Sequence, residues 1–335
     1  SRRNCWDGIM SKLVTIYGGS GFIGRYVARR MAKAGWRVRV AVRRPNEAIF
    51  VKPYGVVGQV EPIFCNIRDD ASVAQSMRGA DAVVNCVGIL QEAGRNTFAA
   101  VQTDGAERIA RMAATAGISQ MVHFSAIGAD LESVSDYGRS KAAGEAGVLA
   151  HMPNAVILRP SIVFGAEDKF FNRFAGMSRI GPILPIVGAN TKFQPVFVDD
   201  LAQAAVMGVT GTAASGIYEL TGPERDSFRG LMQRMLDVVQ RRRLIVGIPM
   251  FAARLMALAF ELGHKLSLGI VPLALTRDQV RSLSVDNVPS GAELGFADLG
   301  IEPTAMESVL PAYLWPFRAS GQYADIKASA KNLKT

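Results

Sequence analysis

The chain has 335 residues, 49% of them hydrophobic, a size typical of one nucleotide-binding domain with a smaller appended part. Its formal net charge of +9 favours contact with anionic surfaces, but no recognition motif accompanies the basic residues, so nucleic-acid binding is not expected. The three cysteines (Cys5, Cys65 and Cys86) and three histidines are too scattered for a metal site, and the sparse, odd cysteine count suggests a reducing compartment.

No part of the chain resembles a targeting or membrane-spanning segment. Met10 begins a segment that would serve as a natural start, and residues 1–9 would then be an extension. The most apolar region, 244–275, is interrupted by Pro249 and by charged residues, whereas a helix that crosses a bilayer needs about 20 apolar residues in a row.

Strands and helices are expected to alternate through the first half of the chain. The apolar run Leu13–Tyr17 and the β-branched run Arg37–Val42 predict two strands, with a helix over 24–34 between them. Further strands are expected at 63–65, 82–86, 121–125 and 155–158, with helices clearest at 97–116 and 137–150. This alternation predicts an α/β fold with a doubly wound parallel Rossmann sheet, whose ligand lies at the carboxyl ends of the strands.

The alternation fades after about residue 165. Glycine and proline punctuate 176–195, and 225–290 looks mainly helical, with a capping box formed by Thr276 and Gln279. We therefore predict two domains: a Rossmann domain over 10–165, to which a later segment at about 194–222 returns, and a smaller, mainly helical docking or substrate-like domain over 166–335.

A glycine turn separates the first expected strand from the first helix. Gly18, Gly21 and Gly24 have the spacing GxxGxxG, which gives a tight turn, a backbone that a pyrophosphate can approach and a free helix N-terminus. The turn therefore predicts a dinucleotide site, with expected contacts from Gly18, Gly19, Ser20, Gly21, Phe22 and Ile23.

The end of the second strand indicates which dinucleotide binds. NAD sites place an acidic residue there, but this chain has Arg43 and Arg44, whose guanidinium groups suit a 2′-phosphate. NADPH is therefore favoured over NADH, although two exposed loop arginines would give the same pattern. The ends of later strands supply further expected cofactor contacts: Asn66 and Ile67 near the adenine, and Val87 and Gly88 near the adenosine ribose.

Tyr137 and Lys141 form a YxxxK motif in the expected helix 137–150. Residues at i and i+4 share one face of a helix, so the lysine can lower the pKa of the tyrosine and hold the nicotinamide ribose. The tyrosine can then move a proton during carbonyl reduction.

With residues 198–202 (VDDLA) and the late pair Asp286 and Asn287, these motifs resemble the extended and atypical short-chain dehydrogenase/reductase superfamily over roughly residues 12–305. Active members of that superfamily usually carry a serine or threonine two residues beyond Ser125, where it donates a hydrogen bond to the substrate carbonyl. That position is Ile127 in this chain, and Ser125 itself lies nearer the cofactor. The resemblance therefore implies that the tyrosine–lysine pair is vestigial.

Three longer segments are similar to one branch of that superfamily, the NADPH-binding accessory subunits of respiratory complex I (NADH:ubiquinone oxidoreductase). They are 137–145 (YGRSKAAGE), 159–172 (RPSIVFGAEDKFFN) and 194–200 (QPVFVDD). Members of that family bind NADPH and are not known for turning it over, and their suggested role is structural, where the peripheral and membrane arms meet near the quinone site.

The resemblance implies NADPH as cofactor, other complex I subunits as partners, and Pro160 and Val163 as further cofactor contacts. It also implies a peripheral place on the cytoplasmic face of a bacterial inner membrane, or alternatively on the matrix face of the mitochondrial inner membrane. An active NADP-dependent reductase or epimerase and a redox-sensing regulator stay open as alternatives.

The C-terminal half contains an amphipathic segment. In 250–265, Arg254, Glu261 and Lys265 lie at spacings of seven and four, which makes one polar stripe on an otherwise apolar helix. Such a helix fits a membrane surface or an apolar partner, and equally a buried helix with one wet edge. The aromatic segment 313–318 (YLWPFR) and the positive charge favour docking.

A basic triplet precedes this helix and admits two interpretations. A solvated helix end and a phosphate or lipid contact explain it equally well. The triplet consists of Arg241, Arg242 and Arg243.

Overall fold

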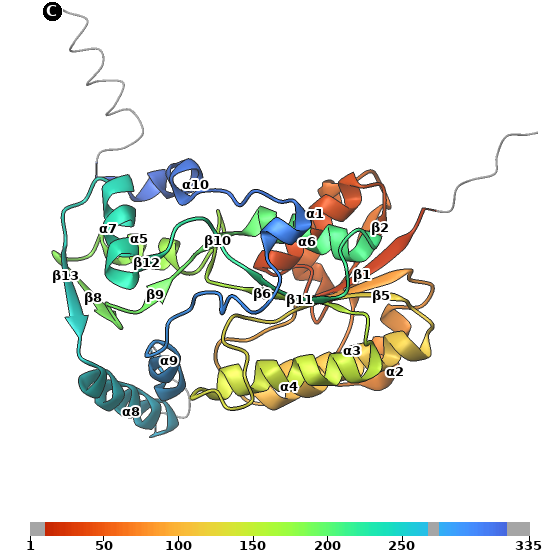
Figure 1. The fold of residues 1–335 in the computed structure, drawn as a ribbon, viewed down its shortest axis with the longest axis horizontal. Helices are drawn as coiled ribbons and strands as arrows, with labels where there is room; N and C mark the ends of the chain where they lie inside the picture. The colour runs from red at the N-terminus through yellow and green to blue at the C-terminus, as the bar shows by residue number, and fades with distance from the viewer. Residues whose placement is uncertain (1–10, 267–274, 320–335) are drawn as a thin grey trace, which may run out of the picture.

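The computed structural model describes residues 11–266 and 275–319; the possible extension at 1–9, Met10 and Cys5 lie outside these ranges. The central element is a seven-stranded sheet with the strand order β11-β6-β5-β4-β1-β2-β3, and every neighbouring pair in it is parallel (Figure 1). This confirms the predicted doubly wound Rossmann sheet. Its strands are β1 (Leu13–Tyr17), β2 (Arg37–Val42), β3 (Val60–Phe64), β4 (Ala82–Asn85), β5 (Gln120–Phe124), β6 (Val156–Pro160) and β11 (Gly216–Leu220).

Helices cover both faces of the sheet (Figure 1). One face carries α1 (Phe22–Lys33) and α6 (Val198–Thr210). The other face carries α2 (Asp70–Ser76), α3 (Asp104–Thr115) and α4 (Asp136–His151). Two helices of other types complete this part: the 3-10 helix η1 (Pro45–Tyr54) after β2, and the π-helix η2 (Ala99–Thr103) that leads into α3.

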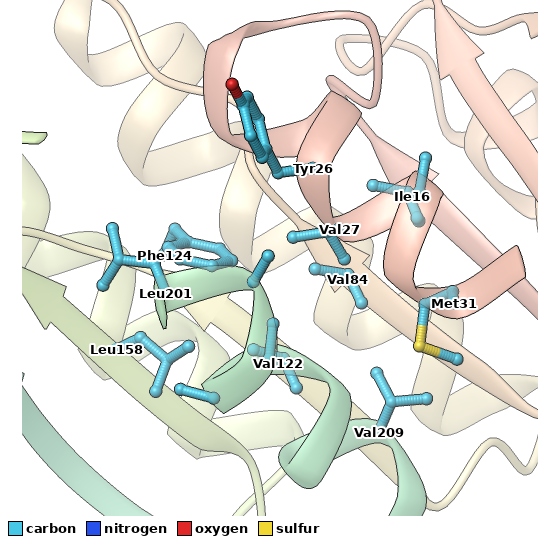
Figure 2. Close-up of a cluster of buried hydrophobic side chains, with 14 of the residues drawn as sticks. Ile16, Tyr26, Val27, Met31, Val84, Val122, Phe124, Leu158, Leu201 and Val209 are labelled. Atoms are coloured by element: carbon cyan, nitrogen blue, oxygen red, sulfur yellow. The ribbon is translucent and has the colours of Figure 1, made fainter. Parts of the chain in front are cut away.

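Two hydrophobic cores form because successive strand residues point to opposite faces of the sheet. Figure 2 shows the core under α1 and α6, where Ile16, Val84 and Val122 from neighbouring strands meet Val27 and Leu201 from the two helices. The second core lies on the opposite face of the sheet, and its members include Tyr17, Val83, Met121, Ile109 and Val148. Burial on both faces explains why these strands are continuous apolar runs.

The C-terminal part lies beyond one end of the sheet (Figure 1). It contains three small two-stranded sheets, in which β7 pairs with β10, β9 with β12, and β8 with β13. A phenylalanine-rich core holds α5, α7 and α10 together. The bounds are β7 (Val163–Phe164), α5 (Phe171–Met177), β8 (Ile183–Val187), β9 (Lys192–Phe193), β10 (Val196–Phe197), β12 (Asp226–Ser227), α7 (Phe228–Val238), β13 (Leu244–Ile248), α8 (Met250–Leu266), α9 (Arg277–Ser282), η3 (Phe296–Leu299), α10 (Met306–Leu314) and η4 (Trp315–Phe317).

Several details differ from the sequence expectations. The strand β13 lies inside 225–290, which was expected to be mainly helical, because its short β-branched run pairs with β8 over five residues. The expected helix 97–116 begins as a π-helix. Cys65 and Cys86 were expected as strand residues but follow the last residues of β3 and β4. The capping box of Thr276 and Gln279 at the start of α9 is confirmed.

Within the described ranges, no helix is both long and apolar enough to cross a membrane. The tail of the expected apolar region, 267–274, lies outside those ranges.

A substitution at Gly24 tests how closely α1 packs against the glycine turn. A Cβ at this position would lie 2.6 Å from Gly19 Cα and closer still to Gly18 O, both rigid backbone atoms. We expect Gly24→Ala to lower the free energy of unfolding by about 2 kcal/mol, measured by urea denaturation. Gly181→Ala is the matched control, since a Cβ there meets nothing within 4 Å. Equal stability of the two variants would contradict this packing.

Candidate functional site

The glycine turn at the carboxyl end of β1 has the geometry of an anion cradle. Gly18 has a φ of 71°, which favours glycine, and its N–H donates to Ala41 O at 3.0 Å. Gly21 N–H donates to Gly18 O at 2.9 Å and closes the turn. Helix α1 starts directly afterwards with no side-chain cap and no acidic residue in its first turn. Its first N–H groups and its positive dipole end are therefore available to a phosphate.

The end of β2 forms an open hollow of about 410 Å³ beside this cradle. Ser20, Val42, Arg43, Arg44 and Glu47 line it. The two arginines predicted to select the cofactor thus lie next to a residue of the glycine turn. Glu47 is a member that the sequence reasoning missed; its Oε1 lies 3.0 Å from Arg44 Nη1 in an exposed ion pair. The hollow combines two cations with one carboxylate.

The expected adenine-side residues lie at the ends of β3 and β4. Asn66 follows β3, and its N–H donates to Ser72 Oγ at 2.9 Å. Ile67 lies against α3, close to Gly105. Val87 follows β4 and adjoins the glycine turn, since its N lies 3.2 Å from the position of a Cβ on Gly18.

Helix α4 carries the tyrosine–lysine pair, in which Lys141 is buried and Tyr137 is half-buried. Lys141 is 5% exposed, and its Nζ donates to Phe124 O at 3.2 Å and lies 3.3 Å from a Cβ position on Gly88. It therefore joins the carboxyl ends of β4 and β5. The Tyr137 ring packs edge-on against Phe98, with centroids 5.9 Å apart.

Burial controls the pKa values of this pair. Loss of hydration lowers the pKa of Lys141 to about 8, even though Glu145 and Cys86 oppose the shift. The YxxxK pattern predicted a tyrosine pKa lowered by the lysine, but burial raises the pKa of Tyr137 to about 12. A general acid works best when its pKa lies near the working pH, and burial moves the pKa of this tyrosine away from neutral pH.

The residues after β5 include one buried hydroxyl, that of Ser125, and a buried isoleucine, Ile127, where the sequence comparison with the superfamily expected a hydroxyl. Ser125 is 5% exposed, and its Oγ has no hydrogen-bond partner among the described residues. Ile127 is also buried, and its backbone N–H donates to Pro160 O at 3.0 Å. Its backbone O accepts from Asn287 Nδ2 at 3.5 Å. Val163 begins β7 beyond Pro160.

These residues fit a dinucleotide. The turn has no Cβ in the path of a pyrophosphate, the helix end is uncapped, and Ser125 Oγ and Lys141 Nζ are buried polar groups that can bond hydroxyls of a ribose. No cluster of three or more possible metal-binding side chains occurs in the described parts of the chain.

An ion cluster that is buried except for Glu293 holds α4 against the sheet. Arg159 on β6 donates through Nε and Nη2 to the two carboxylate oxygens of Glu145, at 2.8 and 2.6 Å. Glu219 and Glu293 lie 3.8 and 3.9 Å from its Nη1. Such a planar fork fixes orientation as well as distance, so it sets the position of the lysine one turn earlier on the helix.

A second surface of interest is the outer face of α8. The sequence predicted one polar stripe on this helix, but large apolar side chains dominate its exposed face. Ala253 and Ala257 are buried, whereas Arg254 is exposed and Glu261 pairs with Arg277 of α9 at 2.7 Å. The exposed apolar face of α8 consists of Phe251, Leu255, Leu258, Leu262 and Leu266. This pattern argues against a buried helix with one wet edge.

The three arginines before β13 differ in their contacts: two bond backbone oxygens of loops, and one is exposed. Arg241 Nε donates to Phe317 O and Arg243 Nε to Ser178 O, at 2.8 and 2.7 Å, so both hold loops together. Arg242 is exposed. The triplet is therefore mainly structural.

Comparison with known proteins agrees with this geometry. The model of the NAD dependent epimerase/dehydratase family matches residues 14–220, which is more than half of the chain. A solved structure of the Bordetella bronchiseptica enzyme WbmG in complex with NAD has the same fold, with a TM-score of 0.68 at 16% identity over 93% of this chain and 95% of that one.

Two curated proteins are more similar in sequence. The chain is 31% identical to NADH dehydrogenase (ubiquinone) 1 alpha subcomplex subunit 9 of Arabidopsis thaliana mitochondria, over 92% of this chain and 79% of that protein. It is 30% identical to a protein of Caulobacter vibrioides named ceramide reductase, over 64% of this chain and 66% of that protein.

The buried ammonium of Lys141 gives a pH-dependent prediction. Below pH 8 both the folded and the unfolded chain carry the charge, and the folded chain bears the full cost of burying it. Between pH 8 and 10.5 only the unfolded lysine stays protonated, so wild-type stability rises with pH. We expect Lys141→Met to raise the free energy of unfolding at pH 7 by about 1 kcal/mol or more, with an advantage that shrinks as pH rises through this window.

Denaturant unfolding at a series of pH values measures the difference in free energy of unfolding between Lys141→Met and wild type. A stability advantage for Lys141→Met that grows with pH would contradict the assigned cause. Lys12→Met, at an exposed residue next to β1, is the control.

Proposed function

The chain belongs to the NAD dependent epimerase/dehydratase family, and from this premise we propose that it is a non-catalytic, NADPH-binding accessory subunit of respiratory complex I. The single observation that carries the proposal is Ile127. The elements that bind a dinucleotide are all present, while the position expected to donate a hydrogen bond to a substrate carbonyl has no donor. Loss of one such donor costs on the order of a hundred- to thousandfold in rate.

The choice of NADPH rests on the hollow at the end of β2. Arg43 and Arg44 supply guanidinium groups next to Ser20, where a 2′-phosphate on the adenosine ribose would lie. Glu47 neutralises Arg44 when no anion competes for it, and a 2′-phosphate would take its place at that guanidinium. Gly18, Gly21 and the first turn of α1 would hold the pyrophosphate, and Ser125, Tyr137 and Lys141 the nicotinamide half. The nicotinamide ring of a bound NADPH would supply a hydride donor at this end of the site.

The placement in complex I rests on similarity and on α8. The Arabidopsis relative carries the name of a complex I subunit, and the similarity spans nearly the whole chain. The exposed apolar face of α8, together with a net charge of +9, suits contact with an anionic lipid surface or an apolar partner. We therefore propose a peripheral subunit whose C-terminal part docks and whose bound nucleotide stabilises the Rossmann part.

Detergent extraction of membranes tests this function. A tagged full-length chain, expressed in its own host, should co-purify in stoichiometric amount with complex I subunits, and the extracted nucleotide should be NADPH. Recovery as a free protein without bound nucleotide would contradict the proposal.

An active NADP-dependent reductase is the second candidate. Two observations favour it: Tyr137 and Lys141 are both retained, and a relative of similar identity is named ceramide reductase. In this reading Tyr137 Oη gives the proton and Lys141 orients the ribose. Turnover that Tyr137→Phe abolishes would establish it, and activity created by Ile127→Ser would show that Ile127 blocks the site.

The arginines at the end of β2 give a selectivity prediction. We expect Arg43→Ala to lower the preference for NADPH over NADH by about tenfold or more, because a charge-assisted bond to the 2′-phosphate is lost. Fluorescence titration with both nucleotides measures the ratio. Arg37→Ala, at the opposite end of β2, is the control and should leave the ratio unchanged. An unchanged ratio in Arg43→Ala would contradict the assignment.

The exposed face of α8 gives a docking prediction. Leu255 is 65% exposed, so Leu255→Glu should leave thermal unfolding unchanged. The variant should bind vesicles of anionic phospholipid at least about tenfold more weakly in a flotation assay, since an apolar contact becomes a repelled charge. Val57→Glu, an equally apolar and fully exposed position after η1, is the control. Equal flotation of Leu255→Glu and wild type would exclude α8 as the lipid contact.

A further inference from the structure

The N-terminus of α4 is capped by a carboxylate from the C-terminal part. Asp278 of α9 accepts the N–H of Asp136 through Oδ1 at 2.6 Å and the N–H of Tyr137 through Oδ2 at 3.1 Å. Of the first N–H groups of the helix, its own cap Ser135 accepts that of Gly138 through Oγ, at 3.0 Å. The first N–H groups of a helix have no partner within it, so this helix end is complete only when α9 is in place.

Asp278 is itself firmly held. It lies in the first turn of α9, whose capping box fixes the backbone there. Arg277, the preceding residue, bonds both carboxylate oxygens of Glu261 on α8, through its N–H at 2.9 Å and its Nε at 2.7 Å. Arg281, one turn later, lies 3.7 Å from the carboxylate of Asp136. Helix α9 is thus tied to α8 on one side and to α4 on the other.

The turn that Asp278 caps is the turn that presents the nicotinamide half of the site. Tyr137 receives one of the two bonds through its own backbone N–H, and Lys141 follows one turn later on the same face. The adenosine half is built by other elements, the glycine turn and the end of β2. A change at Asp278 therefore acts on one half of the ligand site.

We propose that Asp278 is a positioning residue for the nicotinamide half of the nucleotide site. The inference rests on the proposed function only in that a dinucleotide binds. A carboxylate at a helix N-terminus satisfies two N–H groups and opposes the positive end of the helix dipole. Without it the first turn frays, and Tyr137 and Lys141 lose the fixed geometry that bonds a ribose. The C-terminal part then sets how tightly this half of the ligand is held.

Comparing the affinities for two ligands distinguishes a positioning role of Asp278 from a general loss of stability. NADPH occupies both halves of the site, whereas adenosine 2′,5′-bisphosphate occupies only the adenosine half. We expect Asp278→Ala to weaken NADPH binding by about tenfold in isothermal titration calorimetry of the full chain, and bisphosphate binding by less than about twofold. Asp278→Asn keeps one acceptor and should lie between Asp278→Ala and wild type. If Asp278→Ala does not fold, Asp278→Asn decides the test.

A matched control is available in the same part of the chain. Asp298 Oδ2 accepts the N–H of Gly295 at 2.7 Å and caps η3 away from α4. Asp298→Asn should leave both affinities unchanged. Glu261→Gln, which weakens the anchor of α9 on α8, should reduce NADPH binding in the same direction as Asp278→Ala but less.

The outcomes distinguish this inference from the proposed function. If wild type binds both ligands and Asp278→Ala weakens both equally or neither, the positioning role is wrong while the nucleotide site stands. A lower melting temperature with unchanged affinities likewise overturns the positioning role. If wild type binds neither ligand, both proposals fail. Selective loss of NADPH binding, with the adenosine ligand retained, supports the positioning role.

Discussion

One buried lysine constrains the nicotinamide half of the proposed nucleotide site. Lys141 Nζ lies where α4 meets the carboxyl ends of β4 and β5, and the protein offers it the carbonyl of Phe124 as a hydrogen-bond partner. Glu145, one turn further on, attracts the charge, but that carboxylate is already committed to the fork with Arg159. Loss of hydration outweighs these gains and depresses the pKa of the lysine. A group that destabilises the fold in this way is typical of a binding site, where a ligand supplies the missing partners.

The candidate site combines groups suited to binding a nucleotide with groups that are poorly suited to a reaction on it. In the proposed function, the glycine turn and the uncapped start of α1 would hold the pyrophosphate, and the arginines after β2 would hold a 2′-phosphate. At the nicotinamide end, burial raises the pKa of Tyr137 to about 12, and Ile127 has no group to polarise a carbonyl. The proposal of a held nucleotide joins these two local features to the similarity with a complex I subunit.

The predictable features of the molecule are the ones with local causes. The bounds of β1 and β2 follow from apolar runs that end at glycines or arginines, and the start of α9 follows from its capping box. The parallel, doubly wound character of the sheet follows from the alternation of strands and helices, whereas its strand order comes from the structure. The YxxxK spacing located the tyrosine–lysine pair, although the loss of hydration that raises the pKa of the tyrosine depends on tertiary packing, which no spacing encodes.

The missed features depend on contacts between distant parts of the chain. Asp278 has no local signal that would connect it with Tyr137, because the two are 141 residues apart. Strand β13 exists through its pairing with β8. Glu47 is only three residues from Arg44, but the hollow that both line also needs Ser20 of the glycine turn. For α8, the helical pattern was readable, but only the tertiary structure shows that its apolar side chains face outward.

The central claim is that the nucleotide is held and not turned over. The most direct measurement follows the near-ultraviolet absorbance and fluorescence of bound NADPH in purified complex I while NADH reduces ubiquinone over many turnovers. The account predicts that the bound nucleotide stays reduced and in place throughout. Oxidation of the bound NADPH in step with turnover, or its exchange into solution on the same timescale, would contradict it.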